Sequence, residues 1–240
     1  MGMRAATGSI LCGLFSVALA IAQVSDGCPQ GFGGSDRAKE KNRPSASGAT
    51  YTSLNHGNAI TAAAWFDQTC QWDTELAPQR PWNKPDYQDK AVDGVETARV
   101  KLRGYLVSVK KDPSDHDFHV EIADLPKWDS RHLIAGFPSI QFACDARATL
   151  TDLVQKDIDK YHVTFNGNKH ALHKAVCVEV EGFVFLDMHH SKQGEADCET
   201  DGGRGLHMPT PGAKSKVVGL YEVHPAFSVK ALQSSACTGA

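Results

Sequence analysis

The feature that most constrains the fold is a long alternating segment between Lys174 and Met188. Its even-numbered positions are valine, leucine or glycine from 176 to 186, and its odd-numbered positions include Cys177, Glu179 and Glu181. A period of two over this length predicts a β-strand with one face in a core. Gly182 lies in the middle, where a missing side chain lets a long strand bend. We therefore expect a strand that curves between two faces of a sheet.

The rest of the pattern predicts a mainly β fold. Four further strands are expected at residues 100–107, 118–123, 139–144 and 216–229. One amphipathic helix is expected behind a cap at Asp145, because its apolar residues recur at helical spacing: Leu150, Leu153, Val154, Ile158 and Tyr161. The order β-β-β-α-β-β predicts an OB-like five-stranded Greek-key barrel, disulfide-stapled, with the helix between strands three and four. A generic α+β sandwich is the alternative.

Residues 1–22 are typical of a signal peptide, with Arg4 before an apolar stretch that ends in small residues. Cleavage is expected after Ala22, or after Ala20, and predicts a secreted or periplasmic protein. A buried helix is the alternative. No other stretch is apolar for the ~18 residues that a membrane span needs.

The remaining chain divides into two parts. Residues 23–94 are predicted to form a flexible extension and a proline-rich linker, and residues 95–240 the barrel domain. The linker contains an aromatic block, Trp65, Phe66 and Trp72, which we expect to pack on the domain rather than form a stacking surface.

Six cysteines follow the leader, and an even number in an exported chain predicts disulfides. They are Cys28, Cys70, Cys144, Cys177, Cys198 and Cys237. The sequence does not choose among the possible connectivities, and our working guess pairs them as 28–70, 144–177 and 198–237. The close cysteine pairs of a zinc knuckle or a thioredoxin-like site are missing from the sequence.

The charge balance gives no overall signal for nucleic-acid binding. The net charge is −3, or −4 without the leader and its Arg4. A basic strip, Lys101, Arg103, Lys110 and Lys111 with Tyr105, either binds oligonucleotides or is a solvated strand face, and the acidic net charge favours the second.

Ionisable residues gather where the expected strands end. Asp187, His190 and His224, with His119 nearby, are candidate ligand-binding residues, because the loops that carry them are expected on one side of the barrel. Asp187, His190 and His224 suit a divalent metal such as zinc. Glu222 is expected on the same strand face as His224 and is the candidate general base. The alternative is that these side chains only cross-link strand ends, and His170 and His173 are expected at the surface.

Three motifs resemble those of a group of bacterial exported proteins of unassigned function. The motifs are Asp117-Phe118-His119, the segment from Gly182 to His190, and Glu222-Val223-His224-Pro225. The resemblance spans residues 95–229, implies the OB-like fold and points to six residues: Asp117, His119, Asp187, His190, Glu222 and His224. A long cysteine-containing insertion after His190 departs from the group's pattern.

Together these observations predict a non-enzymatic binding module for an unknown ligand. The alternative is a metal-dependent hydrolase, of phosphodiesters for instance, that uses the Asp/His cluster.

Overall fold

The structure is a computed structural model that describes residue 28 and residues 52–76, 95–163, 169–187, 216–217 and 219–238. Its strands are β1 (Thr52–Ser53), β2 (Ile60–Thr61), β3 (Ala98–Lys111), β4 (Phe118–Ala123), β5 (Arg131–Phe137), β6 (Lys169–Leu186), β7 (Lys216–Val217) and β8 (Tyr221–Ala231). Its helices are α2 (Ala62–Leu76) and α4 (Cys144–Tyr161), with 3-10 turns η1 (Leu54–Gly57), η3 (Gln141–Ala143) and η5 (Ser234–Ala236). The fold is mainly β, as the sequence predicts.

The long strands pair in a closed ring. Their order is β3-β4-β5-β8-β6, and β6 pairs back with β3. All of these neighbours are antiparallel except β5 and β8, which run parallel. The short strands β1 and β2 join β3, and β7 joins β5. The apolar core lies inside the ring.

Gly182 lies where β6 bends, as its position in the sequence predicts. The register with β8 shifts on both sides of this residue. A Cβ atom at Gly182 would lie 2.6 Å from Val223 Cγ1 and 2.7 Å from the Pro225 carbonyl oxygen. Only glycine therefore allows β8 to approach β6 this closely.

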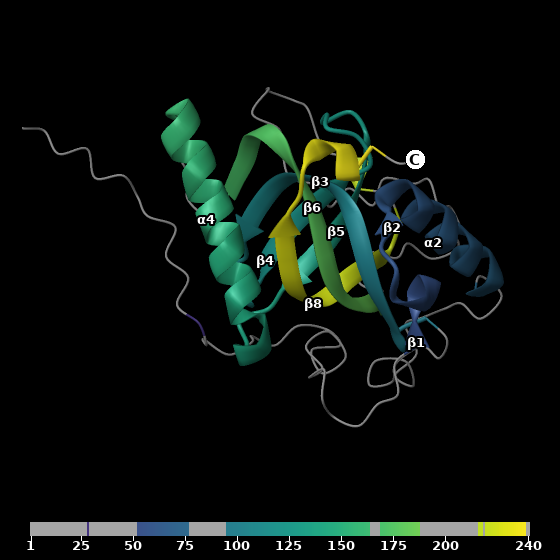
Figure 1. The fold of residues 1–240 in the computed structure, drawn as a ribbon. Coiled ribbons are helices and arrows are strands. Elements are labelled where there is room, and N and C mark those ends of the chain that lie inside the picture. The colour runs from purple at the N-terminus through teal and green to yellow at the C-terminus, as the bar shows by residue number, and fades with distance from the viewer. Residues whose placement is uncertain are drawn as a thin grey trace, which may run out of the picture.

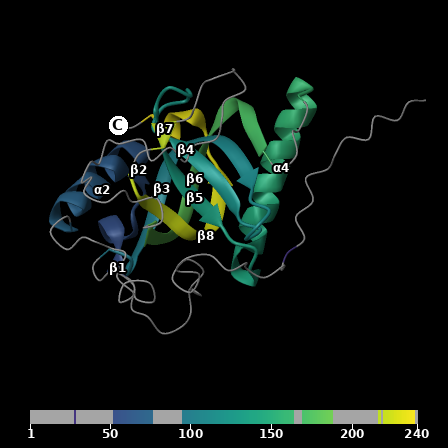
Figure 2. The same cartoon turned by 180° about the vertical axis from the view of Figure 1, so that it is seen from behind.

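The two helices lie at opposite sides of the strand ring (Figures 1 and 2). Helix α4 packs against β6 and β8 and buries Leu150, Val154 and Ile158 in the core. The predicted helix is confirmed, although the residue that caps it is Ala143, and Asp145 lies in its first turn.

Helix α2 contributes the aromatic block to the same core. Trp65, Phe66 and Trp72 are each at most 6% exposed, and the ring of Trp72 lies 5.5 Å from that of Tyr221 on β8. The expected packing of these aromatics is confirmed. Residues 52–76, which the sequence places in the extension and linker, thus pair with β3 or pack on it.

The position predicted for the third strand is wrong. Residues 141–143 form η3 and residue 144 begins α4, whereas the third long strand is β5 at Arg131–Phe137. Nearly all of β5 is buried on both faces, so its sequence, RHLIAGF, lacks the alternation that marks a half-buried strand.

The guessed disulfide pairs are also wrong. Cys28 bonds to Cys144 and Cys177 bonds to Cys237, and Cys70 is also in a disulfide. Cys198 lies outside the described residues. The first bridge ties a segment before the ring to the start of α4, and the second ties a segment after β8 to β6. None of the described helices is long and apolar enough to cross a membrane.

Candidate functional site

A buried acid and histidine face covers the outside of β4, β5 and β8. The neighbouring inward residues Val120, Leu133 and Val223 belong to the apolar core, so Glu121, His132, Glu222 and His224 point away from it. These four side chains belong to residues that are at most 2% exposed. Burying ionisable groups is costly unless they have partners, so their pairing determines what this face can do.

The central pair is Asp117 with His224. The carboxylate Oδ2 of Asp117 lies 2.9 Å from Nε2 of His224, and neither residue is exposed. Asp117 immediately precedes β4 and His224 lies on β8, so the bond crosses over β5. The backbones of β4 and β8 are two strand spacings apart, about 10 Å, and the two side chains together span this distance.

Gly136 on β5 makes this crossing possible. A Cβ atom at Gly136 would overlap the imidazole of His224. His119 on β4 pairs in register with the same glycine. The ring of His224 therefore lies over the backbone of β5 and reaches Asp117 because position 136 has no side chain.

The turn between β3 and β4 is held from several sides. Its backbone closes by a hydrogen bond from Asp112 N–H to the Asp117 carbonyl oxygen at 2.8 Å. His116 has a left-handed φ of 62°, and its carbonyl oxygen accepts a bond from the buried guanidinium of Arg147 on α4 at 2.9 Å. The N–H of Asp117 donates to Asp115 Oδ1. A strained residue that its surroundings fix in this way is a feature of many ligand-binding loops.

Asp112 is held in its ionised form within this turn. Burial by itself raises the pKa of Asp112, but hydrogen bonds from the hydroxyl and backbone N–H of Ser114, together with the Lys110 ammonium, outweigh it. Oδ1 accepts both Ser114 bonds, at 2.6 and 2.9 Å, and Lys110 Nζ lies 2.9 Å from Oδ2. The pKa of Asp112 therefore lies well below its ordinary value of 3.8.

The same turn offers donor atoms to a cation. Within the described part of the chain, Asp112, Asp115 and His119 present one ligand atom each within 4.8 Å of one another. Asp112 and His119 are partly exposed and Asp115 is buried. We call Asp112, Asp115, Asp117, His119 and His224 the turn site: Asp112 and His119 are its partly exposed members, and Asp115 and the Asp117–His224 pair are its buried ones.

Two further buried acid and histidine pairs were not predicted. Nδ1 of His132 on β5 lies 2.8 Å from Oε2 of Glu121 on β4, and Nε2 of His170 on β6 lies 2.9 Å from Oδ2 of Asp157 on α4. His170 is only 4% exposed, so its predicted surface position is wrong, whereas His173 is exposed as expected. The sequence gives one sign of this pair: Asp157 is the neighbour of Ile158, which belongs to the apolar side of the predicted helix.

The predicted ligand set is only partly brought together. Asp187 follows β6, and its N–H donates to the Leu220 carbonyl oxygen, four residues before His224. That offset amounts to about 13 Å along a strand. Glu222 pairs with Phe185 across β6 and β8, and His190 lies outside the described residues. The strand register thus places His224 beside Asp117. Asp187 lies instead next to Leu220, just before β8 begins, and therefore away from His224.

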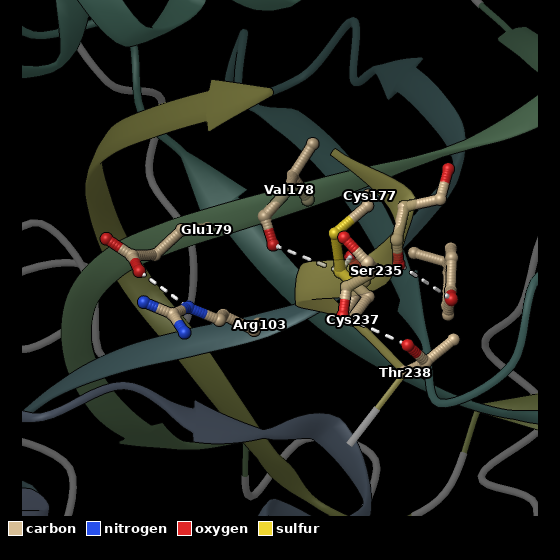
Figure 3. Close-up of a disulfide and its surroundings, with 10 residues drawn as sticks. Arg103, Cys177, Val178, Glu179, Ser235, Cys237 and Thr238 are labelled. Carbon is tan, nitrogen blue, oxygen red and sulfur yellow. Dashed lines mark hydrogen bonds and ion pairs between the residues drawn. A yellow bond between two sulfur atoms is a disulfide. The ribbon is translucent and has the colours of Figure 1, made fainter. Parts of the chain in front are cut away.

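Two residues of the basic strip on β3, Lys101 and Arg103, pair with glutamates of β6. Arg103 lies 2.8 Å from Glu179, Arg99 lies 2.6 Å from Glu181, and Lys101 reaches the same Glu181 at 4.0 Å. Figure 3 shows the Arg103–Glu179 pair beside the C-terminal disulfide. Burial raises the pKa of Glu179, but Lys230 and Arg103 outweigh it and the net shift is downward. These partners reduce the charge that the strip offers to a phosphate backbone.

Comparisons with family models, with curated proteins and with solved structures found no match to this chain. The resemblance to a group of exported proteins therefore stays a prediction, and the function rests on the geometry of the site.

A double-mutant cycle tests the crossing over Gly136. Gly136→Ala should lower the free energy of unfolding by about 1 to 3 kcal/mol, because its methyl group displaces the His224 imidazole. In a His224→Ala background the same change should cost less than about 1 kcal/mol, because the space is already free. Urea unfolding of the four proteins measures both. An equal cost in the two backgrounds would contradict the geometry.

The ionised state of Asp112 predicts a pH dependence. A carboxylate whose pKa is lowered by folding stabilises the fold above its unfolded pKa of about 3.9, and this contribution is lost as the pH falls. Asp112→Asn should therefore destabilise the protein near neutral pH, and the difference should shrink below about pH 4. Denaturant unfolding of the unmodified protein and of Asp112→Asn, at several pH values from neutral to below about pH 4, measures this difference in the free energy of unfolding. Asp129→Asn, at a side chain that is 71% exposed, is the matched control and should show no such trend.

Proposed function

We propose that this protein is an exported, non-enzymatic binding module with an OB-type Greek-key barrel, and that its ligand binds at the turn site. The disulfides support export, since such bonds persist in oxidising compartments, and the apolar leader at residues 1–22 supports it independently.

The strand order supports the OB assignment. In an OB barrel the first strand pairs with the second and the fourth, the third runs beside the fifth, and a helix joins strands three and four. The ring β3-β4-β5-β8-β6 has these neighbours, with α4 between β5 and β6. In this assignment β4 and β5 are strands two and three, and the turn at 112–117 is the loop between strands one and two.

The fixed turn at residues 112–117 is the single observation that carries the binding proposal. OB domains bind ligands on strands two and three and on the loop between strands one and two. Here that loop is fixed by a buried arginine from α4 and by the Asp117–His224 bond from β8. A loop fixed before binding loses little conformational entropy when a ligand arrives.

The charge of the site selects the class of ligand. Asp112 is a partly exposed carboxylate with the buried carboxylate of Asp115 beside it, and Lys110 is already paired with Asp112. Carboxylates and imidazoles accept hydrogen bonds from hydroxyl groups, while phosphates would be repelled. The proposed ligand is therefore a neutral, hydroxyl-rich molecule such as an oligosaccharide.

Binding of neutral oligosaccharides tests this proposal. Titration with maltohexaose and with chitohexaose should perturb backbone amide NMR signals of residues 112–119 and of β4, and single-stranded oligodeoxythymidine should not. His119→Ala should weaken binding roughly tenfold, about 1.4 kcal/mol, by removing one hydrogen-bonding contact. The exposed His173→Ala is the matched control and should bind as the unmodified protein does. No perturbation by either sugar at millimolar concentration would refute the proposed ligand class.

A second candidate is metal-dependent hydrolysis, which the donor group Asp112, Asp115 and His119 favours. Zinc would hold two carboxylates and one imidazole and leave a position for water. Ligand atoms about 2.1 Å from zinc lie about 3.4 Å apart, so the donors would need to close slightly and the ion would need to displace Lys110 from Asp112.

Zinc titration separates the two functions. If the second candidate holds, calorimetry of chelator-treated protein should give one equivalent of zinc that is lost in His119→Ala and kept in His173→Ala. The loaded protein should then hydrolyse bis(4-nitrophenyl) phosphate. Zinc binding without hydrolysis leaves the binding module as the function, and absence of zinc binding eliminates the hydrolase.

A further inference from the structure

A short C-terminal segment crosses the outside of β3 and β6 after the last strand ends. We call residues 232–238 the strap. Its first N–H, from Leu232, donates to the Cys177 carbonyl oxygen at 2.8 Å, and η5 follows at Ser234–Ala236. Cys237 then bonds to Cys177 on β6 (Figure 3). The strap is therefore attached at both of its ends to the same strand residue.

The strap covers a small apolar cluster that is separate from the main core. The cluster contains Tyr105 and Val107 on β3, Ala123 on β4, and the disulfide itself, all at most 7% exposed. Leu232 and Ala236 of the strap pack against it, and so does Trp128 from the loop between β4 and β5.

Without the disulfide, little holds the strap in place. Gln233, Ser234 and Ser235 are exposed, and the one side-chain bond from the body to this stretch in the described residues is a long one of 3.5 Å from Tyr105 OH to the Ser234 carbonyl oxygen. Leu232 and Ala236 are only partly buried and contribute a small hydrophobic area, and segments with so few contacts open locally.

Trp128 connects the strap to the acid and histidine face. Its ring packs on the strap cluster on one side and lies 5.9 Å from the His132 ring on the other. His132 in turn holds Glu121 of β4 at 2.8 Å. The strap and Trp128 therefore pack on one shared apolar cluster, which links the strap to this pair.

We propose that the strap is a redox-sensitive lock, and that its release frees Trp128 and weakens ligand binding through the Glu121–His132 pair. The last step rests on the proposed binding function, whereas the release itself does not. The reductant is a dithiol of the thioredoxin type. One of its thiolates attacks Cys237 Sγ when the strap opens, which breaks the Cys177–Cys237 bond and forms a mixed disulfide. Cys177 leaves as a thiolate and takes up a proton.

The second thiol of the reductant then displaces Cys237, so that both cysteines become thiols and the reductant becomes a disulfide. Both cysteines are buried in the closed state, at 7% exposure for Cys237 and 2% for Cys177. Cys237 is the sulfur attacked because it follows the exposed turn of η5 and moves out with the strap, whereas Cys177 lies within β6. When the strap rebinds, the same exchange in reverse restores the lock: the disulfide form of the dithiol is the oxidant, it is reduced to the dithiol, and the Cys177–Cys237 bond forms again.

Paired serine variants test the lock without a reductant. In Cys177→Ser/Cys237→Ser, backbone amides of residues 232–238 should exchange with solvent at least about tenfold faster, and the emission of Trp128 should shift to the red. Subtracting the spectrum of the same protein with Trp128→Phe isolates that emission. Cys28→Ser/Cys144→Ser is the matched control and should change neither signal. Unchanged exchange in the first variant would overturn the lock.

Ligand binding then distinguishes release of the strap from the effect of that release on the binding face. Maltohexaose and chitohexaose should bind the Cys177→Ser/Cys237→Ser protein several-fold more weakly than the control variant. A released strap with unchanged affinity would overturn the link to the binding face and leave the binding function standing. A released strap in a protein that binds neither sugar would instead refute the proposed ligand class and leave the lock standing.

Discussion

The pairing of β3 with β6 is the constraint on which the rest of the structure depends. These are the two longest strands, and their contact closes the ring that begins with β3 and β4. Closure leaves an interior filled by packed apolar side chains, so the ionisable groups of β4, β5 and β8 lie on the outside of the ring. Closure also requires β6 to pair with both β3 and β8 while its backbone bends. Gly182 therefore lies where the register with β8 shifts.

The outside of the ring is divided into three surfaces with different chemistry. Ion pairs between β3 and β6 form a solvated surface, the strap covers a small apolar cluster, and β4, β5 and β8 carry the buried acid and histidine pairs. The surface of β4, β5 and β8 lowers the stability of the fold by the desolvation free energy of the ionisable side chains that are buried there. The hydrogen bond between Asp117 and His224 offsets part of that cost and fixes the turn that presents Asp112 and His119.

The sequence predicted elements that show a clear period and missed those that do not. Alternation identified β4 and β6, and helical spacing identified α4, because each has one polar side. Strand β5 is buried on both sides and has no such signal, so it was placed several residues too late. Cysteine count predicted disulfides but not their pairs, since bonding depends on which Cα atoms come within about 6 Å after folding.

The candidate site shows the same division. From the motifs alone the sequence drew attention to Asp117, His119, Glu222 and His224, because ionisable residues in otherwise apolar strands need an explanation. It did not indicate which of them meet. The partner of His224 was decided by the parallel contact of β8 with β5 and by the missing side chain of Gly136, which lets an imidazole reach across one strand to Asp117. Residue type and period are local properties that a sequence displays, whereas partners across a closed sheet are set by register, and register is a property of the folded chain.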